Sequence, residues 1–256
     1  MLEFYDSSPW SLHIQQTRLK SACALSKAHI KCLVWGTDAL AYIHFIPTGL
    51  FALHLVVADQ DVQQASTQIM ESLPYKHCTS IPDSYFEPIF FNPNRPTQFP
   101  HSVHLEPTTP HDKRDIDDPE MIIIHPQSQM YLDVHDKSRS VSLPSFPDAI
   151  RFPTRTAFID SMIETYLDPP TGQVHTKMKE MLSGWMSYFL LYTLRNHPRV
   201  LPNGDLEPEH AEVLQSLRPE NQPYFEFFTH GGTLGSDRIV HAMRRKDVLQ
   251  KLGCAL

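Results

Sequence analysis

The pattern of apolar and polar residues divides the chain into a mixed first part and a helical second part. In the first part, apolar residues at helical spacing alternate with short runs of β-branched and aromatic residues that are typical of buried strands. The pattern predicts helices over 11–28 and 61–72, strands over 30–35 and 51–57, and a brief helix after the turn at 36–38. Further strands are predicted over 102–105, 121–125 and 130–134.

Beyond Pro153 the pattern is that of helices alone, predicted over 154–167, 173–196, 207–217 and 237–252. The longest of these repeats apolar residues, among them Leu182, Trp185 and Phe189, at helical spacing, which predicts one broad face buried in a core. The expected fold class is therefore α+β. A mixed sheet with flanking helices is predicted in a domain spanning 1–150, followed by a helical domain spanning 151–256.

Composition narrows the range of partners. The chain has 256 residues, 41% of them hydrophobic, and a formal net charge of −7. The sequence shows no basic face, so nucleic-acid binding is not indicated. A local patch that binds tRNA is still compatible with this net charge. The longest apolar run, 181–193, is too short to span a bilayer, and no membrane partner is expected. The four cysteines lack the spacing of a zinc site or a disulfide framework, and no secretory signal precedes them, which predicts a cytoplasmic protein with reduced thiols.

One segment resembles a known family. The stretches VWGTDALAYI (34–43), IPTG (46–49) and LFALHLVVAD (50–59) are similar to nucleotidyltransferase-like proteins of filamentous fungi, in which a strand ending in Trp-Gly leads into a short helix, a Pro-Thr turn and a second strand. A weaker match, MIIIHPQSQMYLDV (121–134), looks like the later strand pair of that family. The resemblance implies a polymerase-β-type nucleotidyltransferase fold.

The resemblance also implies a site, which is degenerate here. Nucleotidyl transfer usually employs two divalent cations held by carboxylates, two of them at positions i and i+2 of one strand. This chain has Ala52 and His54 at those positions, and the later match offers Asp133 as the third acid. His54 and Asp133 are thus the candidate catalytic residues, with Asp133 as a ligand for Mg²⁺ or another divalent cation. Gly36 and Thr37 are the candidate phosphate-binding residues.

The sequence leaves three functions open. The first is a nucleotidyltransferase-fold protein with a degenerate metal site that binds a nucleotide or another phosphate-bearing small molecule, with a transferase of fungal secondary metabolism as one form of this function. The second is a tRNA-dependent, arginine-containing cyclodipeptide synthase. Its substrate-binding acids would be Asp117, Asp118 and Glu120, although the spacing is one residue shorter than the Asp-Asp-x-x-Glu pattern associated with those enzymes. Carboxylates suit an arginyl group because they pair bidentately with guanidinium. The third is a non-catalytic interaction protein.

Overall fold

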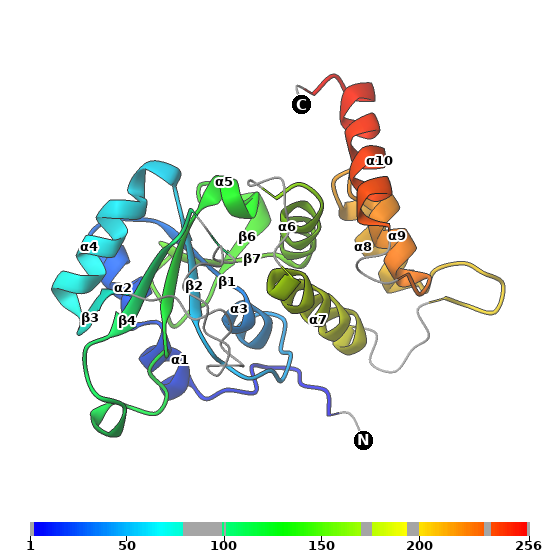
Figure 1. The fold of residues 1–256 in the computed structure, drawn as a ribbon. Coiled ribbons are helices and arrows are strands. Elements are labelled where there is room, and N and C mark those ends of the chain that lie inside the picture. Colours follow the sequence, from blue (N-terminus) through cyan, green and yellow to red (C-terminus); the bar gives the residue numbers. More distant parts are fainter. Residues whose placement is uncertain are drawn as a thin grey trace. The chain divides into compact units, whose positions relative to one another are not determined.

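The computed structural model describes residues 3–78, 99, 101–169, 176–193, 200–232 and 237–254. The chain forms two compact units, Met1–Thr154 and Arg155–Leu256. The first unit contains the sheet, and the second is built from helices (Figure 1).

The core of the first unit is a seven-stranded mixed sheet with the order β3-β4-β5-β2-β1-β7-β6 in the described part of the chain. Its strands are β1 (Cys32–Trp35), β2 (Leu53–Val57), β3 (Tyr75–His77), β4 (Val103–Pro107), β5 (Ile122–Pro126), β6 (Ser140–Ser142) and β7 (Ile150–Pro153). The pairs β2–β5 and β1–β7 are parallel, whereas β1–β2, β3–β4, β4–β5 and β6–β7 are antiparallel. The central strands β1, β2 and β5 are buried along their whole length, as expected for strands covered on both faces.

Helices flank this sheet, which confirms the predicted α+β class. They are α1 (Leu12–Arg18), α2 (Lys20–Lys27), α3 (Thr37–Tyr42), α4 (Val62–Ser72) and α5 (Gln127–Met130). The Ser11 side chain accepts a hydrogen bond from the Ile14 backbone N–H and caps α1. Helices α2 and α4 pack against each other and lie together on one side of the sheet (Figure 1).

Two of the predicted segments differ from the structure. The helix predicted over 11–28 is interrupted at Leu19, which separates α1 from α2. The strand predicted over 130–134 is wrong, because residues 127–130 form α5 and Tyr131 ends this helix in the left-handed conformation, with φ of 54°. The chain then continues as a turn, so β5 has no strand following it directly.

The second unit consists of α6 (Arg155–Leu167), α7 (Thr176–Thr193), α8 (Pro208–Ser216), α9 (Gln222–Thr229) and α10 (Arg238–Lys251), and so confirms the predicted helical C-terminal part. The apolar face of α7 is buried as predicted, and the ring of Phe189 stacks on that of Phe158 with centroids 6.0 Å apart. In the ranges that the structure describes, no helix combines the length and apolarity needed to cross a membrane.

Buried charges join the helices of the second unit. Glu164 on α6 is fully buried, and its carboxylate accepts hydrogen bonds from the guanidinium groups of Arg218 (2.7 Å) and Arg245 (3.1 Å). The Asn221 side chain donates to Glu164 (3.1 Å) and to Asp160 (2.8 Å). These partners compensate the cost of burying two carboxylates among apolar side chains.

Candidate functional site

The turn between β1 and α3 has the backbone geometry that the sequence suggested. Gly36 has φ of 73° and ψ of −144°, a conformation that residues with a Cβ rarely adopt, and it caps the N-terminus of α3. Thr37 begins α3 directly afterwards. Both Gly36 and Thr37 are buried. The two candidate phosphate-binding residues therefore lie at a turn that favours glycine, and both are buried.

A buried ion pair supports this turn. The Arg18 guanidinium donates from Nε to Asp38 Oδ1 at 2.6 Å and from Nη2 to Asp38 Oδ2 at 3.0 Å, and Nη2 also donates to the Phe51 carbonyl at 2.9 Å. Burial alone would lower the pKa of Arg18, but the charge and hydrogen bonds of Asp38 outweigh it and raise the pKa instead. The carboxylate of Asp38, which would otherwise repel a phosphate at this turn, is thus neutralised.

The strand register places histidines together on one face of the sheet. Trp35 on β1 lies opposite His54 on β2, His54 lies opposite Ile123 on β5, and Ile123 lies opposite His104 on β4. Directly opposed residues point to the same face, and so does His125, two residues beyond Ile123. The strand face that carries His54 therefore also carries His104 and His125.

A chain of hydrogen bonds runs across this face. His54 Nδ1 lies 2.9 Å from His125 Nε2, and His125 Nδ1 lies 2.7 Å from Ser102 Oγ. Ser102 Oγ in turn donates to Gln129 Oε1 at 2.8 Å. The rings of His54 and His125 are nearly parallel, with centroids 5.2 Å apart and an interplanar angle of 7°. We call these four residues the histidine chain; they come from β2, from β5, from the position before β4 and from α5.

Aromatic rings enclose the histidine chain and keep it neutral. Trp35 and Phe99 make edge contacts with both imidazoles, the closest being Phe99 with His125 at 4.6 Å between centroids. Burial lowers the pKa of His54 to about 3 and that of His104 to about 4, and it holds the pKa of His125 well below its ordinary value. For His54 and His125, repulsion among the histidines acts in the same direction. All three imidazoles are therefore uncharged at physiological pH.

The residues of this face do not fit a Mg²⁺ site. Mg²⁺ requires oxygen ligands, and Ala52 supplies no side-chain ligand while His54 offers only imidazole nitrogens. Among the residues with described side chains, no group of three or more histidine, cysteine, aspartate or glutamate residues is arranged to hold a metal ion.

Asp133 is not on a strand beside His54, where the sequence placed it. It lies in the turn after α5, where its side chain is exposed and its Oδ1 accepts a hydrogen bond from the His135 backbone N–H at 2.8 Å. β5 pairs with β2 instead, and the residue opposite His54 is Ile123. Asp133 is therefore not available as a third carboxylate on a strand beside His54.

The acidic run 115–120 is a surface loop. Asp118 Oδ1 pairs with Lys20 Nζ at 2.9 Å, and the Asp117 backbone N–H donates to Asp115 Oδ1 at 3.1 Å. Glu120 is exposed. Asp118 thus contacts α2, and the Asp117 backbone contacts its own loop.

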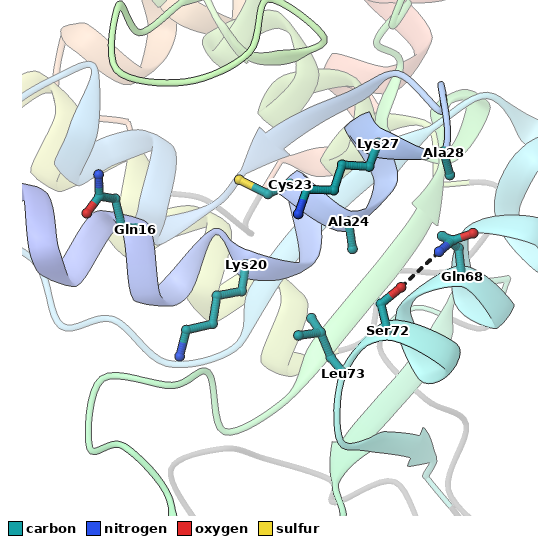
Figure 2. A pocket seen from close by; sticks show the side chains of 9 residues that line it. All are labelled: Gln16, Lys20, Cys23, Ala24, Lys27, Ala28, Gln68, Ser72 and Leu73. Carbon is teal, nitrogen blue, oxygen red and sulfur yellow. Dashed lines mark hydrogen bonds between the residues drawn. The ribbon is translucent and has the colours of Figure 1, made fainter.

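A separate groove lies between α2 and α4. It has a volume of about 420 Å³, and its lining includes Lys20, Cys23 and Lys27 from α2 together with Gln68 and Ser72 from α4 (Figure 2). Gln68 Nε2 donates to Ser72 Oγ at 2.8 Å across one turn of α4. The lining contains neither Gly36 nor a member of the histidine chain, so this groove is a feature apart from the candidate site.

Sequence reasoning identified one member of the histidine chain, His54, and missed the other three. A signal for His125 was present, because a histidine that ends an otherwise apolar strand run is unusual and calls for a polar partner. Ser102 and Gln129 gave no comparable signal. Comparison with known proteins adds no relative: no protein-family model matches the chain, and none of the curated proteins matches it.

Proposed function

We propose that the protein is a nucleotidyltransferase-fold protein that binds a nucleotide or another phosphate-bearing small molecule without carrying out two-metal transfer. The observation that carries the proposal is the unit of β1, the Gly36 turn, α3 and the antiparallel strand β2, in which His54 lies opposite Trp35. This unit has the order of elements that the resemblance implies. The parallel pairing of β5 with β2 is compatible with the same fold.

The loss of metal chemistry follows from the side chains of β2 and β5. Two-metal transfer requires several carboxylates within reach of both cations, and the two strand positions that would supply them hold Ala52 and His54. Asp133 is exposed and engaged with the backbone of its own turn. A neutral imidazole can accept or donate a hydrogen bond, but it cannot replace the charge of two carboxylates.

The β1–α3 turn supports phosphate binding. Gly36 leaves room for close approach because it has no side chain, and Thr37 supplies a hydroxyl at the same turn. Arg18 neutralises the neighbouring Asp38 and so removes the nearest repulsive charge. Because Gly36 and Thr37 are buried, we expect ligand binding to require a local opening of the chain around them.

The test is calorimetric titration of the protein with ATP, GTP, CTP and UTP, each with and without Mg²⁺, combined with a pyrophosphate-release assay. We expect saturable binding of at least one nucleotide, little dependence of its Kd on Mg²⁺, and no pyrophosphate release. Absence of binding for every nucleotide would overturn the proposal. Mg²⁺-dependent release of pyrophosphate would show that transfer chemistry is intact.

A pair of glycine variants separates binding from stability. Gly36→Ala strains the candidate turn, whereas Gly204→Ala strains a loop of the second unit in which glycine also has positive φ and an added Cβ would meet no atom within 4 Å. Each change costs on the order of 1 kcal/mol or more of folding stability. We expect only Gly36→Ala to weaken nucleotide binding. Equal affinities of the two variants would argue against a site at Gly36.

A further inference from the structure

We propose that the groove between α2 and α4 binds a small molecule that carries several anionic groups, phosphates or carboxylates, and that the Asp118 carboxylate occupies part of this site in the free chain. The groove has a volume of about 420 Å³, which lies within the range of about 300–1,000 Å³ that is usual for small-molecule sites. Its lining does not include Gly36, so the inference does not rest on the proposed nucleotide site.

Two lysines give the groove its charge. Lys20 and Lys27 both line it from α2, two helical turns and thus about 10 Å apart along the helix axis. Between them the lining has the small side chains of Cys23 and Ala24, which leave room beside the helix. The residues that line the groove include no carboxylate that would neutralise either lysine. Two cations in such a groove favour an anionic ligand over a neutral or cationic one.

Lys27 is the cation that is available to a ligand. In the described part of the first unit, the ion pairs all involve other cations. The charge of Lys27 acts instead on the thiol of Cys23: burial raises the pKa of Cys23, and Lys27 opposes this shift. The two side chains therefore lie near each other in the groove (Figure 2).

The contact of Lys20 shows that an anionic group already binds at the other end of the groove. Lys20 Nζ lies 2.9 Å from Oδ1 of Asp118, which is 98 residues away in the sequence and lies in the loop before β5. The Lys20 side chain is 47% exposed and that of Asp118 is 21% exposed. Because a solvent-exposed pair of this kind contributes little to stability, a ligand with a higher charge can displace the carboxylate from Lys20.

Polar groups of α4 complete the site opposite the two lysines. Gln68 Nε2 donates to Ser72 Oγ at 2.8 Å (Figure 2), so the hydroxyl proton of Ser72 does not take part in this bond. The hydroxyl can therefore donate to an anionic oxygen, and so can the second N–H of the Gln68 amide. Neutral donors from α4 and cations from α2 together suit the oxygens of a phosphate or a carboxylate.

The first test is calorimetric titration of the full chain at low salt with inorganic phosphate, pyrophosphate, tripolyphosphate and citrate. We expect binding to strengthen from phosphate to tripolyphosphate, because only the longer anions can contact both lysines. A preference for tripolyphosphate over citrate would identify phosphates as the ligand groups, whereas equal affinities would show that several carboxylates suffice. Absence of binding for all four anions would overturn the proposal.

A lysine variant locates the bound anion. Lys27→Met should weaken the binding of tripolyphosphate about three- to tenfold, because it removes one charged contact. The matched control is Lys137→Met, which removes an exposed lysine of the same unit outside the groove and should leave the Kd unchanged. A Kd that Lys27→Met does not alter would place the anion elsewhere and overturn the proposal.

An aspartate variant tests the competition at Lys20 and has the opposite sign. Asp118→Asn should lower the Kd of tripolyphosphate about two- to fivefold, because the ligand no longer displaces a carboxylate. Asp148→Asn removes the carboxylate from the exposed pair with Lys137 and controls for the change in net charge. Equal Kd values for the Asp118→Asn and Asp148→Asn variants would refute the competition.

The wild-type protein provides a further test that does not depend on the folding of a variant. Cys23 lies in the groove and is partly exposed, whereas Cys254 is exposed in the second unit. Alkylation by iodoacetamide is followed for each cysteine by mass spectrometry of its peptide. Tripolyphosphate should slow the alkylation of Cys23 and leave that of Cys254 unchanged. A rate at Cys23 that saturating tripolyphosphate does not change would contradict binding in the groove.

Discussion

Mild acid should destabilise the first unit because its buried histidines are neutral in the folded state. The pKa values of His54 and His104 lie near 3 and 4, below the ordinary value of 6.5 that they regain on unfolding. Between these values the unfolded chain binds more protons than the folded chain, so stability is complete above pH 6.5 and falls as the pH drops through this window. At pH 5 each of the two histidines costs about 2 kcal/mol relative to pH 7.

Together the two histidines would remove about 4 kcal/mol, a large part of a typical folding free energy of about 5–15 kcal/mol, and His125 acts in the same direction. The assay is urea denaturation at pH 7, 6 and 5, followed by tryptophan fluorescence. His104→Gln should reduce the stability lost between pH 7 and pH 5 by about 2 kcal/mol. The exposed His77, changed to Gln, is the matched control and should leave the slope unaltered. A stability that stays constant from pH 7 to pH 5, or a slope that His104→Gln does not change, would refute the reasoning.

Further predictions concern the buried charges and the metal. Arg18→Met should destabilise the protein by about 3–5 kcal/mol in urea denaturation, because it leaves Asp38 buried without its cation. A second change, Asp38→Asn, should recover part of the loss. No recovery in the double variant would contradict an electrostatic cause. Arg245→Met should lower the free energy of unfolding by about 2 kcal/mol, less than a complete loss of pairing, because Glu164 keeps Arg218 as a partner. A loss as large as that from Arg18→Met would contradict this compensation. Treatment with EDTA should leave the Kd of any bound nucleotide unchanged, and a marked weakening would reveal a metal that the side chains do not suggest.

The central strands were predictable because their sequences are short apolar runs between turn residues. The edge strands were missed since little of their pattern is apolar: in β3, only Tyr75 is buried. The strand predicted over 130–134 shows the opposite error. Met130, Leu132 and Val134 are buried and alternate with more exposed residues, as in a strand, but Tyr131 turns the chain away from the sheet. The alternation of apolar and polar residues correctly indicated which side chains are buried, but it did not indicate a strand.

The candidate site was predictable only at the level of single positions. His54 was found because the family that the segment resembles has a carboxylate at this position, whereas its partner His125 is 71 residues away in the sequence and is brought near by the β2–β5 pairing. Ser102 reaches His125 through the pairing of β4 with β5, and Gln129 does so because α5 follows β5 directly. Such a chain of contacts depends on sheet order, which local sequence patterns do not encode.

The contacts of Arg18 have a consequence for shortened forms of the protein. Its guanidinium connects the last residue of α1 with the first turn of α3 and with the carbonyl of Phe51, just before β2. Suppose that limited proteolysis or an internal start removes the chain up to Leu19. The shortened chain then lacks α1 and the guanidinium of Arg18, which compensates the burial of the Asp38 carboxylate. Helix α1 therefore carries the cation that neutralises Asp38 at the β1–α3 turn. A chain that lacks α1 should also lose the fold of the first unit.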